Sequence, residues 1–291
     1  MTAATFCVLA LSLQQSPAQT PTPWKAVDSV LGRTGTLQGE TYRVGFPRND
    51  LHVTVGAVTV RAALALGSWV AFKQTPDSQA MLMGDLVLLE SEVGPVLDAL
   101  QQGGIEQTAM HNHLLGETPH VVYVHINGRG RPAALATTVR TALARTRTPP
   151  ATTVPAAPVS FNLDTAQIAQ IIGAHGRVTG GVYQIGVPRA APVTVDSVEV
   201  SPAMGVATAI NIQPTSAGNA VTTGDFVMIA SEVNPVLRAL RANGIAVTAL
   251  HSHMLTESPR LLFMHFWGDG DALKLARGLR AALDQMNIKR N

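Results

Sequence analysis

The amino-acid sequence predicts an α+β protein built from two tandem copies of one domain. The string His111-Asn112-His113 returns as His251-Ser252-His253, an offset of 251 − 111 = 140 positions. Within each copy, segments with alternating Val and Thr are interleaved with segments of helical periodicity. At 291 residues the chain is long enough for two domains that each bury their own core.

The internal repeat extends well beyond the histidines. Residues Tyr42–Arg48 match Tyr183–Arg189, and Gly84–Val87 match Gly224–Val227. A stretch rich in Pro and small residues separates the copies and predicts an extended linker. The predicted boundaries are 1–23 for a signal peptide and mature N-terminal tail, 24–147 for repeat 1, 148–160 for the linker and 161–291 for repeat 2.

Each repeat is predicted to contain the same elements in the same order. These are an opening helix (24–31; 165–174), strands rich in Val and Thr, a strand (85–90; 225–230), a helix capped by Ser91 or Ser231, a strand (105–113; 245–253), an apolar strand (121–126; 261–266) and a last helix. Glycines after the central helix predict its end. Leu275, Leu279 and Leu283 recur every four positions in the last helix of repeat 2.

The order strand, helix, strand, strand, helix is that of a ferredoxin-like half with an antiparallel sheet. The two histidine-bearing strands are predicted to pair antiparallel. The earlier Val- and Thr-rich strands either extend that sheet or form a second one. The fold class is therefore α+β, as a tandem duplication.

The N-terminal segment has the pattern of a secretory signal. Residues 3–13 are apolar and uncharged, and Ser16-Pro17-Ala18 offers small residues for cleavage. This predicts export, although no Lys or Arg precedes the apolar run, which leaves a frayed N-terminus as the alternative. Cys7 is the only cysteine and would leave with the signal, so thiol ligands and disulfides are excluded from the mature chain. No transmembrane segment is predicted after it.

Six of the nine histidines fall in two copies of the pattern His-x-His-x3-Glu-x7-His. Imidazole and carboxylate suit zinc, copper, iron or manganese better than calcium, so we predict a divalent transition-metal site in each repeat. The predicted ligands are His111, His113, His125, His251, His253 and His265, and the predicted ligands or general bases are Glu117 and Glu257. The alternative is that the histidines are hydrogen-bonded core or surface residues retained from a duplication.

The place of His125 depends on strand register. Side chains two apart on a strand point the same way, so His111 and His113 can share one face. A turn centred between Gly116 and Glu117 would pair residue 125 with residue 108 and turn it to the opposite face. A turn centred at Thr118 would pair it with residue 111 and complete the set. The sequence leaves both registers open.

Several other residues that stand out have simpler interpretations. Arg48 and Arg189 each follow a proline and are expected at the surface, with contact to an anionic ligand as the alternative. Asp85 and Asp225 each follow a glycine before a predicted strand, which favours a turn at least as readily as catalysis. Trp69 has no counterpart in repeat 2 and is expected to fill the first core.

The quoted blocks also resemble a known family. Gly224–Val227, Ser231–Val236, Thr248–Leu255 and Glu257–Arg260, with their counterparts in repeat 1, are similar to the LppY/LpqO-like family of exported bacterial proteins and lipoproteins, a tandem domain of unknown function. The resemblance covers both repeats. It implies a secreted or periplasmic protein, free or attached to the cell envelope, and it implies no established reaction.

Together these observations predict an exported protein with two transition-metal sites. The first functional hypothesis is a metal-dependent hydrolase that acts on an unknown small molecule. The alternative is a non-catalytic module that binds a ligand or a cell-envelope component. A net charge of +2 without a basic stripe argues against nucleic acid as a partner.

Overall fold

The computed structural model describes residues 22–151 and 159–289. The predicted signal peptide and most of the predicted linker lie outside these ranges. Within them, no helix combines the length and the apolar character that crossing a membrane requires.

The elements of repeat 1 are α1 (Thr22–Leu31), β1 (Thr36–Gln38), β2 (Thr41–Pro47), β3 (Thr54–Val55), β4 (Val58–Thr59), α2 (Ala62–Ala65), β5 (Gly67–Gln74), β6 (Ala80–Leu89), α3 (Glu90–Gln102), β7 (Glu106–His111), β8 (Glu117–Thr118), β9 (Val121–Gly130) and α4 (Pro132–Leu143). Those of repeat 2 are α5 (Thr165–Ile172), β10 (Gly176–Thr179), β11 (Val182–Pro188), β12 (Val193–Val195), β13 (Val198–Val200), the 3-10 turn η1 (Pro202–Met204), β14 (Ala207–Ser216), β15 (Asn219–Met228), α6 (Ala230–Ala242), β16 (Ala246–His251), β17 (Glu257–Ser258), β18 (Leu262–Asp271) and α7 (Ala272–Leu283).

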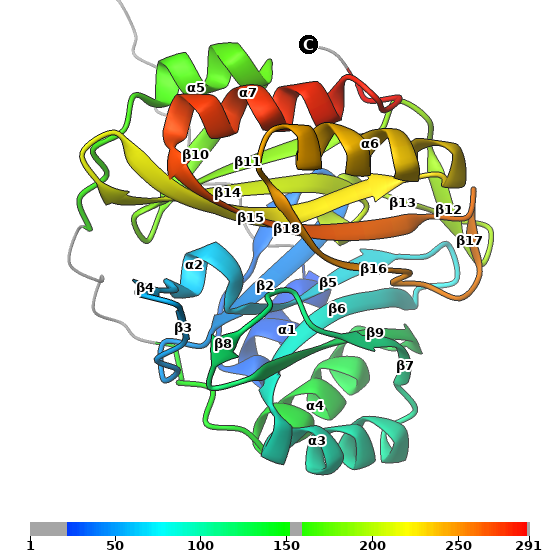
Figure 1. Cartoon of the computed structure of the whole chain (residues 1–291). Helices are drawn as coiled ribbons and strands as arrows, with labels where there is room; N and C mark the ends of the chain where they lie inside the picture. The colour runs from blue at the N-terminus through cyan, green and yellow to red at the C-terminus, as the bar shows by residue number, and fades with distance from the viewer. Residues whose placement is uncertain (1–21, 152–158, 290–291) are drawn as a thin grey trace, which may run out of the picture.

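The two repeats form a four-layer sandwich. Two six-stranded sheets face each other, and the long helices of each repeat cover the outer face of its own sheet (Figure 1). The sheet orders, β1-β2-β5-β6-β9-β7 and β10-β11-β14-β15-β18-β16, are the same in the two repeats. Each repeat adds a small three-stranded sheet, β4-β3-β8 or β13-β12-β17.

The predicted β-α-β half is confirmed in both repeats. In repeat 1, β6 leads through α3 into β7, and β9 lies between these strands and pairs antiparallel with both. Repeat 2 does the same with β15, α6, β16 and β18. The earlier strands do both things that the sequence left open, because some extend the large sheet and others form the small one.

The start of α3 differs from the prediction. The helix begins at Glu90, so Ser91 lies inside it and does not cap it. The carboxylate of Glu92 instead accepts a hydrogen bond from the backbone N–H of Leu89 at 2.9 Å. Repeat 2 has the same arrangement, with Glu232 and Ile229 at 2.9 Å. Here the glutamate three residues on supplies the acceptor for a free N–H of the first turn.

Both faces of each large sheet are buried. One face packs on its own helices, and separate cores form there in repeat 1 and repeat 2. The inner faces pack on each other through two apolar clusters that contain residues of both repeats. One of these clusters joins Met81 and Met83 to Phe263, and the other joins Tyr123 to Val182. The repeats therefore share an interior in addition to their own cores.

Candidate metal centre

Strand register places three histidines of each repeat on the inner face of its sheet. His125 on β9 lies opposite Ala109 on β7, which is neither of the two registers considered from the sequence. Because residues 109 and 111 are two apart, His125 nevertheless shares a face with His111. The counterparts in repeat 2 obey the same register, with His265 opposite Ala249.

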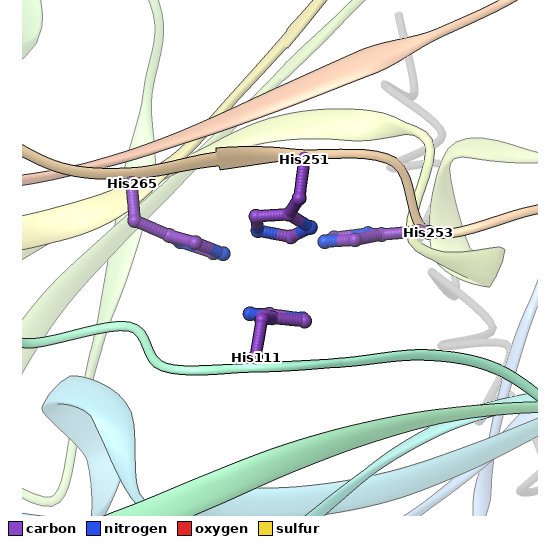
Figure 2. A group of neighbouring side chains, drawn as sticks. All are labelled: His111, His251, His253 and His265. Atoms are coloured by element: carbon purple, nitrogen blue, oxygen red, sulfur yellow. The ribbon is translucent and has the colours of Figure 1, made fainter.

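The six histidines meet in one cluster between the sheets. Figure 2 shows His251, His253 and His265 of repeat 2 around a common centre, with His111 of repeat 1 pointing into it from the facing sheet. The ring centroids of His111 and His251 are 3.6 Å apart. The sequence predicted one site within each repeat, and the structure brings the two predicted sets of histidines together between the facing sheets.

The cluster follows a pseudo-twofold axis that passes between His111 and its own counterpart His251. His113 stacks on His265 at 3.8 Å, and His125 stacks on His253 at 3.6 Å. Because 253 is the counterpart of 113 and 265 of 125, these two contacts are the same contact made twice. This is the pattern of an isologous interface, here within one chain.

A pair of hydrogen bonds crosses the same axis. The hydroxyl of Thr108 donates to the backbone carbonyl of His253 at 2.6 Å, and that of Thr248 donates to the carbonyl of His113 at 2.5 Å. Each threonine is the counterpart of the other. The backbone that carries the second histidine of each pair is therefore held by the opposite repeat.

The nitrogen atoms of the cluster are close enough to share an ion. Potential ligand atoms lie within 4.8 Å of one another in two groups, His111 with His251, His253 and His265, and His111 with His113 and His125. His111 belongs to both groups, so the two form a single cluster.

All six Nε2 atoms are buried, and none has a hydrogen-bond partner among the described residues. In three rings the other nitrogen faces a backbone carbonyl, as for His265 Nδ1 and the carbonyl of Gly224 at 2.8 Å, His111 Nδ1 and Asn112 at 3.2 Å, and His251 Nδ1 and Ser252 at 3.4 Å. A carbonyl only accepts, so Nδ1 carries the hydrogen and Nε2 keeps a free lone pair. Metal-binding histidines are commonly oriented in this way.

Burial keeps these imidazoles neutral. It lowers the pKa of His111 to about 3, with the charge of His251 adding to the effect. It lowers the pKa of His251 to about 4. The pKa values of the other four imidazoles lie well below the ordinary value, again chiefly because of burial. At neutral pH the cluster presents unprotonated nitrogens, which is the state that binds metal.

Two aspartates that the sequence placed in turns lie beside the cluster. Asp85 is in the middle of β6 and faces His125 in the register. Its Oδ1 lies 3.9 Å from Nε2 of His125, and its Oδ2 lies 3.9 Å from Nε2 of His113. Asp225 in β15 lies 3.7 Å from Nε2 of His253. Burial raises the pKa of Asp85 to about 7, and burial together with the charge of Asp85 raises that of Asp225 well above its usual range.

The glycines before these aspartates mark close packing between strands. A Cβ at Gly84 would meet the carbonyl oxygen of Trp69 at 2.8 Å, and one at Gly224 would meet that of Ala209 at 1.9 Å. The Gly-Asp pair is therefore a strand feature, and the turn interpretation was wrong. The signal that could have corrected it is the nearly unbroken apolar run around Asp85, which is typical of a strand buried on both faces.

The predicted catalytic glutamates lie outside the histidine groups. Glu117 is on β8 and Glu257 on β17, and both are buried. Glu257 accepts hydrogen bonds from the backbone N–H of Leu261 at 3.0 Å and from Arg260 at 3.2 Å. Glu257 is thus engaged in holding the segment that leads into β18.

The two arginines expected at the surface are buried. Arg48 forms a two-pronged ion pair with Glu92, at 2.7 and 3.0 Å, and also pairs with Asp50 at 2.8 Å. Arg189 pairs with Glu232 in the same way, at 2.6 and 3.2 Å. Each pair joins the end of an early strand to the first turn of the helix after β6 or β15, so these residues have a structural role.

A cavity of about 460 Å³ adjoins the cluster between the two sheets. Four of the six histidines line it, together with Asp85 and Asp225. Trp69, expected in the first core, also lines this cavity, and it packs against the apolar cluster that contains residues of both repeats. A space for a small molecule thus lies next to the histidine cluster.

Comparison with known proteins supports the duplication. The family described as Domain of Unknown Function (DUF1259) matches twice, over residues 25–145 and 166–285. The chain belongs to this family. The matches cover both repeats and include all six clustered histidines, so the centre lies within the two DUF1259 domains and combines residues of both.

No curated protein matches the chain. Among solved structures, a trimeric bacterial microcompartment shell protein, PduB, matches at 14% identity with a TM-score of 0.23, covering 90% of this chain and 97% of that one. EtuB from Clostridium kluyveri matches at 11% identity with a TM-score of 0.20, covering 87% of this chain and 90% of that one. Scores this low carry no argument about fold or function.

Proposed function

We propose that this tandem DUF1259 protein binds one divalent transition-metal ion between its two repeats. The observation that carries the proposal is the set of six buried Nε2 atoms that have no hydrogen-bond partner among the described residues and belong to two groups of neighbouring histidines. An unpaired buried polar atom costs free energy, and six in one place call for a common partner. A metal ion accepts the lone pairs of one such group at once, three or four nitrogens within 4.8 Å of one another.

The geometry favours one ion over two. His111 and His251 lie on either side of the pseudo-twofold axis, so an ion near the axis is within reach of both repeats. His111 also belongs to both groups of ligand atoms, so two ions would compete for it. Two divalent ions this close would repel strongly in a buried site without a bridging carboxylate. Asp85 and Asp225 stand beside the imidazoles, where they can hold the rings in place or balance the charge of the ion.

The donor set limits the choice of metal. Imidazole nitrogen suits zinc, copper, iron and nickel, and manganese is accommodated where carboxylates assist, whereas calcium requires oxygen. The larger group offers four imidazoles, which suit a tetrahedral ion. The protein then supplies all four ligands, which is typical of a closed site.

Metal-dependent hydrolysis is supported less well than metal binding. It requires an open coordination position and a nearby base, and the two glutamates predicted for that role lie outside the histidine groups. The cavity beside the centre is the observation that favours it, because a substrate could enter there. Hydrolysis would then use Asp85 or Asp225 as the base. The non-catalytic binding module that the sequence also suggested is compatible with a closed metal centre.

The proposed location rests on the sequence alone. The N-terminal pattern of residues 1–23 and the resemblance to the LppY/LpqO-like family support export to the periplasm or beyond, free or attached to the envelope. A centre built only from imidazole and carboxylate, with no thiol, suits an oxidising compartment.

Elemental analysis of the untagged protein, purified without chelator, tests the proposal. We expect bound zinc, copper, iron, nickel or manganese, and we expect the metal-free protein to gain thermal stability when the same metal is returned. At a free metal concentration a thousandfold above the dissociation constant, the gain is about 4 kcal/mol. Protein that contains no metal and gains no stability from any of these five ions would overturn the proposal.

A further inference from the structure

The cavity beside the centre also contains two arginines, one from each repeat. Arg43 is on β2 and Arg177 on β10, and both line the same cavity of about 460 Å³. We propose that this cavity binds a small hydroxylated organic anion, whose carboxylate or phosphate is held by Arg43 and Arg177. The proposal goes beyond metal binding and does not depend on it, because neither arginine belongs to the histidine cluster.

Arg43 is held in place but is not neutralised. Its guanidinium lies over the ring of Trp69, 3.6 Å from the centroid, and Nη1 donates to the carbonyl of Ala203 at 2.6 Å. No carboxylate of the described residues lies within ion-pair distance of it. Burial, aided by the charge of Arg177 and opposed by that of Asp85, lowers the pKa of Arg43 to about 10, so the side chain stays charged at neutral pH. Several N–H donors of a fixed, planar guanidinium remain for a ligand.

Arg177, which is exposed to solvent on β10, brings a second positive charge to the edge of the same cavity. Within residues 22–151 and 159–289 it forms no ion pair and no side-chain hydrogen bond. Two like charges in one cavity repel each other, and an oxyanion bound between them attracts both and offsets that repulsion. Guanidinium groups match both carboxylate and phosphate through paired N–H···O bonds. The arginine pair therefore favours an acid over a neutral molecule.

The rest of the wall favours a ligand with hydroxyl groups. The side-chain NH2 of Gln184 donates to the carbonyl of Ala63 at 2.8 Å, and that of Asn211 donates to the carbonyl of Leu64 at 2.9 Å. Both amides line the cavity with one N–H committed, so each keeps its oxygen as an acceptor and one N–H as a donor. Hydroxyl groups both donate and accept, so they suit such amides. The volume lies in the range of pockets for small organic ligands.

The fold itself does not need these two arginines. Gln184 occupies the strand position in repeat 2 that Arg43 occupies in repeat 1, and Thr36 occupies the position that corresponds to Arg177. Arg43→Gln and Arg177→Thr therefore install residues that the other repeat already carries at the same place. Loss of binding in these variants therefore indicates lost contacts between the arginines and the ligand. Far-UV circular dichroism and thermal unfolding verify that the variants fold.

Calorimetric titration of the metal-free protein with gluconate and with glucose 6-phosphate tests the proposal, and sorbitol serves as the neutral probe. We expect saturable binding of at least one acid, which also tells carboxylate from phosphate, and no binding of sorbitol. Each arginine variant should weaken binding about tenfold or more. Arg238→Gln, an exposed arginine on α6, is the matched control and should bind like the parent protein.

Fluorescence gives an independent readout, because Trp69 lies directly under Arg43. The acid that binds should change the tryptophan emission, and Trp69→Phe should remove most of that change. The proposal is overturned if neither acid binds, if sorbitol binds as well as the acids, or if both arginine variants bind like the parent. Because metal is absent throughout, none of these outcomes bears on the metal centre.

Discussion

The two repeats are alike where they meet and unlike beside that point. Along the pseudo-twofold axis, every histidine of the cluster and both crossing threonines have the same residue type in the other repeat. At the cavity the matched positions differ, with Trp69 against Ala209 and Arg43 against Gln184. Residues of both repeats form the histidine cluster at the axis, whereas the cavity lies beside it. The comparison shows that the repeats keep the same residues in the cluster and carry different residues in the cavity next to it.

The largest expected effect is the loss of folding stability of the metal-free protein in acid. In the unfolded chain these histidines take up protons near pH 6.5, whereas burial holds the pKa of His111 at about 3 and that of His251 at about 4. Stability is therefore full above about pH 6.5 and is lost as pH falls through this window. At pH 5 each imidazole that stays neutral in the folded state lowers the free energy of unfolding by about 2 kcal/mol relative to neutral pH.

Asp85 and Asp225 act in the opposite direction. Because their pKa values are raised, with that of Asp85 at about 7, these two carboxyls make the protein less stable as pH rises above about 4. Six imidazoles outnumber the two carboxyls, so the loss on acidification dominates. Urea unfolding at pH 7, 6 and 5 measures the net effect, and we expect a steep loss of several kcal/mol on acidification. His175→Gln, at an exposed site, should follow the parent. An unfolding midpoint that does not change between pH 7 and pH 5 would contradict a buried, neutral cluster.

The buried ion pairs allow a direct comparison of the repeats at neutral pH. Glu232→Gln leaves Arg189 without its only ion-pair partner in the described part of the chain, at a cost of about 3–5 kcal/mol. Glu92→Gln should cost less, because Arg48 keeps Asp50 at 2.8 Å. Urea unfolding of both variants at pH 7 gives the difference. Equal costs would show that Asp50 contributes nothing.

The crossing hydrogen bonds should have small and equal effects. Thr108→Val and Thr248→Val each remove a hydroxyl that binds a carbonyl of the opposite repeat, at about 1 kcal/mol per bond. Thermal unfolding measures each variant, and Thr137→Val on the exposed face of α4 is the control. A large effect in one variant and none in the other would break the symmetry that we assign to the axis.

The elements of each repeat could be predicted because their signals are local. Alternating Val and Thr, the glycines after α3 and the leucine spacing in α7 all reflect neighbouring residues. The meeting of the two histidine sets between the repeats could not be predicted, since no local pattern tells which face of a sheet meets another sheet. The nearest clue was the run Ala80–Leu89, which is buried along almost its whole length and therefore needs cover on both sides.

Single residues were misjudged for a related reason. Asp85 and Arg48 looked like residues of a turn and of the surface, which is their ordinary role when only adjacent residues are considered. Their partners lie tens of positions away in the sequence, as Arg48 and Glu92 show. Only the packing of β2, β6 and α3 brings such residues together.

Metal stoichiometry in single-histidine variants tests the central claim most directly. Titration of metal-free parent, His111→Ala and His251→Ala with zinc, followed by removal of free ion and elemental analysis, gives equivalents bound per chain, with His175→Ala as the control. A centre shared by both repeats predicts one equivalent in the parent and in the control, and loss of that equivalent in each of the other two variants. Two equivalents in the parent, with one remaining in each variant, would contradict it and would show that each repeat holds an ion of its own.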